Sequence, residues 1–206
     1  MRNIRKGREP RSLTEYKKHP GATYEGYSQK DDLRRSLVQE QKGLCCYCMS
    51  RIRADRKHMK IEHWQSQSPE KYPERQLDYT NLLGACLGGK GKPKKFQHCD
   101  TLKGDKNLSF NPANPADDVE RLFKFLGDGR IVSDDAMRNE EINKILNLNH
   151  PILIQNRKAV LDAFKERLGK AKLDPHKELP KWDGNHTDEL PEYSQVIVYW
   201  LRKKIK

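Results

Sequence analysis

The sequence predicts an α+β protein in which a small core with short strands lies between helical segments. Three observations support this fold class. Apolar residues recur at helical spacing over 31–43 and again over 139–168, residues 59–63 alternate in polarity, and two short apolar runs flank a Gly-Asp-Gly turn at 127–129. The chain has 206 residues but only 34% hydrophobic content, so we expect a compact core and much polar surface.

The N-terminal half is predicted to be an arm followed by short elements. Residues 1–29 are rich in Arg, Lys, Pro, Gly and Tyr without sustained periodicity, which predicts a basic, extended arm that lies either on the body of the protein or on a partner. A helix is expected over 31–43, because Leu33, Leu37 and Val38 recur at helical spacing and a glycine follows them. A strand is expected at 59–63, a polar loop at 65–76, and a flexible basic insertion, GGKGKPKK, within 87–97.

The C-terminal half is predicted to be a hairpin followed by helices. The Gly-Asp-Gly turn separates 122–125 from 131–132, helices are expected at 139–148 and 151–168, and a last apolar segment lies at 196–201. The longer helix carries one apolar face, more typical of a core than of a partner surface, formed by Leu153, Val160, Leu161, Phe164 and Leu168. We therefore divide the chain into a basic arm (1–29), a core (30–112) and a hairpin and helical part (113–206), the last available for docking a partner.

The charge of the chain favours a polyanionic partner. Lys and Arg total 41 against 29 Asp and Glu, giving a formal charge of +12, which favours nucleic acid first and an acidic membrane surface second. No apolar run approaches the roughly 18 residues that span a bilayer, and no apolar stretch follows the basic N-terminus as in a secretory signal. We therefore expect a cytoplasmic protein with no membrane partner.

Four of the five cysteines form a pattern typical of a structural zinc site. Cys45-x-x-Cys48 lets two sulfurs reach one metal, and Cys86 and Cys99 complete four soft ligands, which close a tetrahedral shell. The alternative is that the cysteines are small buried apolar residues. An odd number of cysteines without an export signal argues against a disulfide framework. Cys46 is left over, and we expect it to pack in the core.

A second metal chemistry is indicated between the cysteine pairs. Glu62-His63 is an acidic-His pair, which suits a hydrolytic metal with a neighbouring base. Taken alone, a histidine on a strand is more often a hydrogen-bonded structural residue. The pair is followed, however, by Asn81 in TNLLGAC and by the stretch HCDTLKGD at 98–105.

With these pieces in this order, the chain resembles the HNH nucleases, whose ββα-metal core often carries zinc-binding cysteine pairs. IEH, TNLLGAC and CDTLKGD match the family pattern. A closer likeness is to the HNH subunit of Septu-type and retron-associated antiphage systems, carried by MRNIRKGREP, LRRSLVQEQKGLCCYC, KIEHW and HCDTLKGDKN over residues 1–125. The resemblance implies that 30–112 is a zinc-stapled ββα-metal core that cuts nucleic acid.

The resemblance also implies roles for individual residues. His63 would be the general base, Glu62 a ligand of the catalytic ion, and Asn81 the residue that holds the loop positioning the histidine. Asp100 would be the second ligand; the family most often has His or Asn there, and the harder carboxylate favours Mg²⁺ or Mn²⁺. One such ion would stabilise charge on the phosphoryl oxygens, and Lys103 is placed in the sequence to meet a phosphate beside it.

The partner and two rival functions stay open at this point. Nucleases of this family are encoded with an ABC/SMC-like ATPase, so the resemblance implies such an ATPase as a partner. The chain itself matches GxxxxGK at 84–90 but lacks the Ser or Thr that follows it in a nucleotide-binding loop, so the ATPase would be another chain. The rivals are a non-catalytic zinc module that binds nucleic acid, and a zinc-dependent adaptor for the ATPase. The sequence does not separate DNA from RNA as the substrate.

Overall fold

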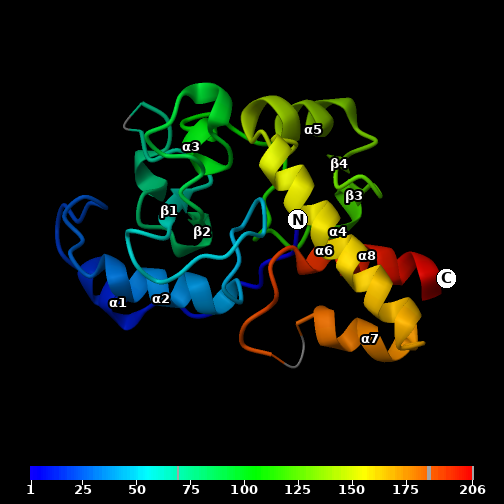
Figure 1. Ribbon diagram of the computed structural model, residues 1–206. Coiled ribbons are helices and arrows are strands. Elements are labelled where there is room, and N and C mark those ends of the chain that lie inside the picture. Colours follow the sequence, from blue (N-terminus) through cyan, green and yellow to red (C-terminus); the bar gives the residue numbers. More distant parts are fainter. Residues whose placement is uncertain (69, 185–186, 206) are drawn as a thin grey trace.

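The computed structural model describes residues 1–68, 70–184 and 187–205, so Pro69, Asn185, His186 and Lys206 lie outside the described part. The fold is mixed, with helices around two small two-stranded sheets. Figure 1 shows two groups of elements side by side, one from each half of the chain, with the N-terminus between them. Within the described ranges, no helix is both long and apolar enough to cross a membrane.

The N-terminal group is built around the first sheet. Strands β1 and β2 are antiparallel, with Glu62 opposite Leu83 and His63 opposite Leu82. Helix α2 packs on β2, and the Gln41 amide that follows α2 bonds both backbone groups of Gly84, at 2.7 and 2.6 Å. The elements of this group are α1 (Arg11–Tyr16), α2 (Lys30–Glu40), β1 (Lys60–His63), β2 (Leu82–Ala85), α3 (Asp100–Lys103) and the short turns η1 (Pro73–Arg75), η2 (Tyr79–Asn81) and η3 (Lys94–Phe96).

The C-terminal group confirms the predicted hairpin and long helix. Helix α8 packs against α6, α7 and β3, and the side chains of Leu153, Leu161 and Phe164 on α6 are buried, as expected of a core face. The elements are α4 (Val119–Leu122), β3 (Lys124–Phe125), β4 (Ile131–Val132), α5 (Ala136–Glu140), the π-helical turn η4 (Glu141–Ile145), α6 (Pro151–Lys170), α7 (Pro175–Trp182) and α8 (Ser194–Ile205).

Three features differ from the sequence-based expectations. Helices α1 and α7 are only 6 and 8 residues long and carry no extended periodicity, so the pattern did not reveal them. The helix expected at 139–148 begins at Ala136 and ends in the η4 turn at Ile145. The insertion at 87–97, expected to be flexible, is a closed loop whose Lys92 carbonyl accepts a 2.8 Å hydrogen bond from the Gln97 amide.

The N-terminal segment lies on both groups rather than apart from them. Met1 and Leu13 are fully buried, Ile4 N–H donates to Pro112 O at 2.7 Å, and Lys6 pairs with Glu40 at 2.8 Å. Arg2 donates to Asp183 O at 2.5 Å on the C-terminal side. The segment therefore lies on the body of the protein, which is one of the two placements expected for it, and joins the two groups.

Candidate metal centre and active site

The four predicted zinc ligands lie together although they come from three separate segments. The sulfurs of Cys45, Cys48, Cys86 and Cys99 all lie within 4.8 Å of one another and all four side chains are buried. Cys45 and Cys99 Sγ are 3.9 Å apart, and Cys48 and Cys86 Sγ are 3.7 Å apart. A tetrahedral ion with Zn–S bonds of about 2.3 Å requires sulfurs about 3.8 Å apart. The geometry and the soft donor set therefore fit zinc.

Electrostatics also indicate that this thiol group is built for a cation. Burial raises the pKa of Cys99, and the neighbouring sulfurs add to the rise. Burial would raise the pKa of Cys45 as well, but hydrogen bonds from the surrounding thiols lower it well below the ordinary value. The surrounding thiols thus favour a negative charge on Cys45, and a zinc ion would provide the positive charge that stabilises thiolates in this buried group.

The backbone around the thiol group is bent into conformations that few residues adopt. Cys99 has φ of +55° and Met49, directly after Cys48, has φ of +67°. Such left-handed conformations in residues with side chains are costly and persist where the surrounding contacts require them. The turn at Met49 brings the Ser50 N–H to 3.5 Å from the Cys48 sulfur. The Cys86 N–H lies 3.3 Å from the Cys45 sulfur.

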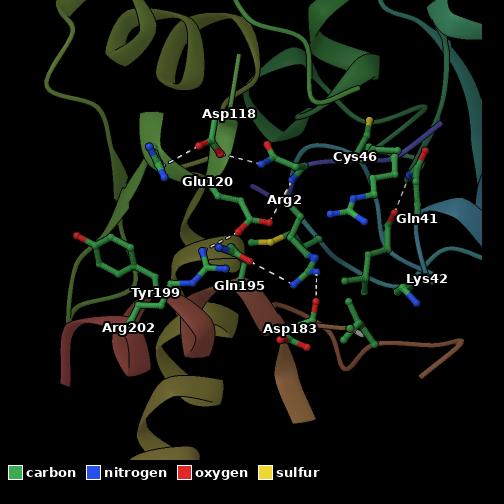
Figure 2. Close-up of a pocket in the computed structure, with 18 of the residues that line it drawn as sticks. Arg2, Gln41, Lys42, Cys46, Asp118, Glu120, Asp183, Gln195, Tyr199 and Arg202 are labelled. Atoms are coloured by element: carbon green, nitrogen blue, oxygen red, sulfur yellow. Dashed lines mark hydrogen bonds and ion pairs between the residues drawn. The ribbon is translucent and has the colours of Figure 1, made fainter. Parts of the chain in front are cut away.

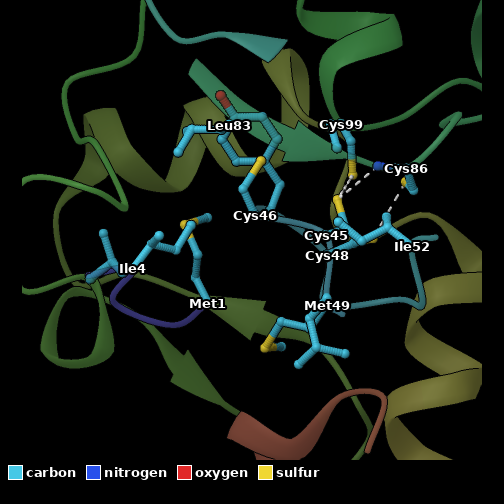
Figure 3. Close-up of a cluster of buried hydrophobic side chains, with 14 of the residues drawn as sticks. Met1, Ile4, Cys45, Cys46, Cys48, Met49, Ile52, Leu83, Cys86 and Cys99 are labelled. Atoms are coloured by element: carbon cyan, nitrogen blue, oxygen red, sulfur yellow. Dashed lines mark hydrogen bonds between the residues drawn. The ribbon is translucent and has the colours of Figure 1, made fainter. Parts of the chain in front are cut away.

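Cys46 is outside this group, as its position predicted. Figure 3 shows its sulfur beside Leu83 on the opposite side of the chain from the converging Cys45, Cys86 and Cys99. Its side chain is 2% exposed, and burial raises the pKa of its thiol well above the ordinary value. Cys46 is therefore a core residue.

The two carboxylates predicted as ligands of a second ion meet in the interior. Glu62 on β1 and Asp100 in the first turn of α3 are 2% and 9% exposed, and they lie close enough for each to shift the pKa of the other. Each also has a cationic partner: Lys103 Nζ lies 2.9 Å from Glu62 Oε1, and Lys60 pairs with Asp100. Tyr47 Oη donates to Glu62 at 2.7 Å.

Proximity separates the proton affinities of these two carboxylates. Burial raises the pKa of Glu62 well above its usual value, and Asp100 adds to the rise. Burial would also raise the pKa of Asp100, but the hydrogen bond from Glu62 and the Lys60 ammonium outweigh it and the pKa is lowered. Two close, buried carboxylates disfavour each other's ionisation, and a divalent cation bound between them would offset that repulsion.

His63 is oriented by a single backbone carbonyl. Its Nε2 lies 3.0 Å from Gln76 O, and because a carbonyl only accepts, Nε2 carries the proton and Nδ1 is the basic nitrogen. The ring packs edge-on against Tyr24, with centroids 4.5 Å apart. Burial lowers the pKa of His63, which keeps the imidazole neutral and able to take a proton at neutral pH.

Asn81 closes the loop that carries this carbonyl. Its side chain is fully buried, bonds both backbone groups of Gln65 at 2.8 and 2.9 Å, and donates to Arg75 O at 3.1 Å. Arg75 is the residue before Gln76, whose carbonyl orients His63. Asn81 thus ties the two ends of the loop together and fixes the histidine's partner.

Lys103 is placed differently from the expectation that it meets a phosphate. Its side chain is fully buried, and besides Glu62 it bonds His63 O at 3.1 Å. The ammonium therefore links α3 to β1 and is not exposed to a substrate. The α3 turn after the Cys99 bend directs it inward, which sequence spacing did not reveal.

Sequence patterns missed two residues that complete the carboxylate site, Lys60 and Tyr47, which contact Asp100 and Glu62. His98, whose place directly before Cys99 left open a role at the zinc or at the substrate, has its Nδ1 3.2 Å from the Cys99 sulfur. Only Lys60 had a usable signal, since a residue two positions before Glu62 on a strand faces the same side of the sheet.

A large cavity lies away from these two sites. It has a volume of about 1120 Å³, and Figure 2 shows it between the N-terminal segment and the C-terminal helices. Arg202 and Glu120 pair across it at 2.8 Å, and Arg2 bonds Gln195 at 3.3 Å. Its polar side chains thus satisfy one another, and neither carboxylate nor His63 lines it.

Comparisons with known proteins give one informative relative. No family model matches the chain. It is 28% identical over 125 residues to a protein of Escherichia coli described as "Retron Ec83 putative HNH endonuclease", which covers 52% of this chain and 48% of the relative. The chain thus spans about half the length of that relative, and the similarity supports the HNH resemblance drawn from the motifs.

Proposed function

We propose that this protein is a metal-dependent HNH endonuclease that hydrolyses phosphodiester bonds of nucleic acid. The observation that carries the proposal is the meeting of Glu62 and Asp100 beside the oriented His63. The similarity to a retron HNH endonuclease supports the same reaction class. In this proposal β1, β2 and α3 form the ββα-metal core, and the four-cysteine group holds a structural zinc ion.

His63 acts as the general base through Nδ1. The proton on Nε2 is held by Gln76 O, so the ring presents its lone pair in one orientation and takes the proton of the attacking water. Asn81 is a positioning residue, because it fixes the loop that supplies the carbonyl. Lys103 is a second positioning residue, since it holds Glu62 and the His63 carbonyl together.

Glu62 and Asp100 would hold Mg²⁺ or Mn²⁺, the hard ions that carboxylates prefer. Such an ion supplies charge stabilisation for the phosphoryl and leaving oxygens. Lys60 pairs with Asp100 and Lys103 pairs with Glu62, and these ion pairs offset the cost of burying the two carboxylates.

The cellular setting proposed rests on the resemblance to Septu-type and retron-associated proteins. There the nuclease is the effector of a cytoplasmic antiphage complex, restrained by an ABC/SMC-like ATPase. Residues 113–206 lie outside the nuclease core and are the part proposed to dock the ATPase. The chain has 41 basic residues against 29 acidic ones, and this positive charge suits a nucleic-acid substrate, DNA or RNA.

The test is cleavage by the protein co-expressed with its ATPase, on plasmid DNA and total RNA with Mg²⁺ or Mn²⁺. We expect His63→Ala to lower the cleavage rate by about 10²- to 10⁴-fold, the usual contribution of a general base. His58→Ala is the matched control, because His58 lies on the same half of the chain but is exposed and pairs with Asp55, away from the carboxylates. Equal cleavage by wild type and His63→Ala contradicts the proposal, and binding without cleavage by wild type favours the non-catalytic zinc module.

The carboxylate pair predicts a separate metal-binding result. Asp100→Asn removes one charged ligand and is expected to weaken Mn²⁺ binding at least about 10-fold, the lower end of the effect of even outer-shell changes. Mn²⁺ binding is measured by electron paramagnetic resonance, with zinc content as the internal reference. Asp105→Asn is the control on the same segment; unchanged Mn²⁺ affinity in Asp100→Asn would remove this residue from the ligand set.

A further inference from the structure

Residues 87–98, called here the lysine loop, carry a concentration of charge that the proposed active site does not use. The loop contains no acidic residue and one aromatic side chain, Phe96, after four lysines: Lys90, Lys92, Lys94 and Lys95. It lies between the zinc-group residues Cys86 and Cys99. A cationic loop with an aromatic tip is a candidate binding surface for an anionic ligand that carries flat rings.

The loop is held in one shape by hydrogen bonds of its own backbone and by one from the Asn147 side chain. Gly88 O accepts from His98 N–H at 3.0 Å, and Asn147 Nδ2 donates to Gln97 O at 2.9 Å. Gly88 and Gly89 have φ of +52° and +74°, and a Cβ on either would lie 2.1 or 2.5 Å from a backbone oxygen of the opposite side. The two strands of the loop approach each other so closely that only glycine fits at these positions. The tip of the loop is therefore already ordered, and binding a ligand there would not cost the entropy of ordering it.

Phe96 is exposed on this rigid support. Its side chain is 44% exposed, whereas nearly all large hydrophobic side chains in the described part of the chain are buried or half-buried. Lys95 Nζ lies 5.0 Å from the centre of the ring, and the His150 ring is 6.4 Å away. One phenyl face bordered by an ammonium group and a second ring is the arrangement on which unpaired bases stack.

The lysines beside Phe96 are available for phosphates. Within the described ranges, no carboxylate pairs with Lys90, Lys92, Lys94 or Lys95, whereas lysines elsewhere, such as Lys6 and Lys158, have acidic partners. Four unneutralised ammonium groups around one aromatic ring favour a polyanion with flat apolar groups. Nucleic acid has this combination of charges and rings, and a protein partner would need matching acidic residues.

The loop also adjoins the carboxylate pair. Thr101 Oγ1 donates to Leu87 O at 2.8 Å, and this hydroxyl lies 3.4 Å from Lys60 Nζ. Lys60 in turn pairs with Asp100. The base of the loop is therefore linked through Thr101 and Lys60 to the proposed ion site. Bases in a duplex are covered by their neighbours, so only an unpaired base can reach the ring.

We propose that Phe96 stacks an unpaired base while Lys94 and Lys95 bind the adjoining phosphates, so that the substrate is single-stranded nucleic acid. This inference rests on the proposed nuclease function and names the substrate class of that site.

The test measures binding in the His63→Ala background, where cleavage is suppressed. Fluorescence anisotropy is recorded with labelled single strands of about 12 nucleotides, as DNA and as RNA, and with the same sequences as duplexes. Phe96→Ala is expected to weaken single-strand binding about 10-fold and to change duplex binding less than about 2-fold. Phe96→Tyr keeps the ring and should restore binding.

Two further variants separate stacking from charge and from general exposure. Met137→Ala is the matched control, because Met137 is another exposed large apolar residue, 55% exposed on α5, and should bind like the parent. Lys94→Gln with Lys95→Gln should lower the salt dependence of single-strand binding by about 1.4 in the log–log slope. A strand carrying 5-iodouracil should crosslink to Phe96.

Each result decides for or against the stacking role of Phe96. The stacking role is overturned if Phe96→Ala and Met137→Ala lose the same amount of single-strand affinity. It is also overturned if duplex and single strand bind equally well and Phe96→Ala changes neither affinity. Both outcomes leave the nuclease proposal intact. Loss of cleavage in His63→Ala with unchanged cleavage of single strands in Phe96→Ala also overturns it. Failure of the parent to bind any nucleic acid overturns both proposals.

Discussion

Cys48→Ala is expected to lose the zinc ion and to unfold the protein at 25 °C. Cys48 provides one of four sulfurs in the buried thiol group, and three remaining thiolates cannot close a tetrahedral shell. Structural zinc provides about 10–16 kcal/mol in small zinc domains, which equals or exceeds the roughly 5–15 kcal/mol by which a whole domain is stable. Zinc content by mass spectrometry and thermal unfolding by circular dichroism measure the two effects.

Cys46→Ala is the matched control for that experiment. Cys46 is two residues before Cys48, is equally buried and is also a thiol, but its sulfur lies outside the four-sulfur group. We expect it to keep one zinc ion per chain and to lose about 1 kcal/mol of unfolding free energy from the small cavity. If Cys48→Ala binds zinc and melts like Cys46→Ala, the thiol group is not a zinc site.

Arg157→Met is expected to lower the free energy of unfolding by about 2–4 kcal/mol. Arg157 on α6 is 1% exposed and donates to Gly129 O at 2.6 Å and Leu148 O at 2.7 Å. Each carbonyl left without a donor costs about 1–3 kcal/mol. Burial lowers the pKa of Arg157 to about 10, so removing the charge recovers some desolvation energy and limits the loss.

The measurement for Arg157 is denaturant-induced unfolding monitored by circular dichroism. The dependence of the unfolding free energy on denaturant concentration is compared between the variants. Lys158→Met is the control, because Lys158 is the next residue of the same helix, is about half exposed, and pairs with Asp162 on the helix surface. We expect that variant to change stability by less than about 0.5 kcal/mol. A loss below about 1 kcal/mol in Arg157→Met would show that the carbonyls find other donors.

Arg157 also illustrates what sequence patterns did not reveal. It follows Leu153 by four residues and precedes Leu161 by four, so it lies on the apolar face of α6, where a charge is unusual. The pattern thus contained a signal for a buried arginine. Its acceptors could not be inferred, because they come from the β3–β4 turn and from the connection before α6.

Some features were predictable because each depends on residue type or on spacing within a short stretch of sequence. These are helices α2 and α6, the β3–β4 hairpin and the grouping of the four cysteines. Helices α1 and α7 were not predictable, since short helices form only when tertiary packing supports them. The same limit explains Lys103. Its spacing from Asp100 indicated the phosphate side of the site, but the bend at Cys99 directs it into the interior.

The sequence by itself determined which chemistries this chain can hold: four thiols for a soft metal, an acidic-His pair for a hard one, and an excess of positive charge. Only the tertiary structure decided how they act. His63 gains its orienting carbonyl from a residue 13 positions away, and the lysine that joins its backbone to Glu62 lies 40 positions away. Spacing within a segment fixes the side of an element a residue faces, whereas proton positions and burial depend on distant segments that meet only in the folded protein.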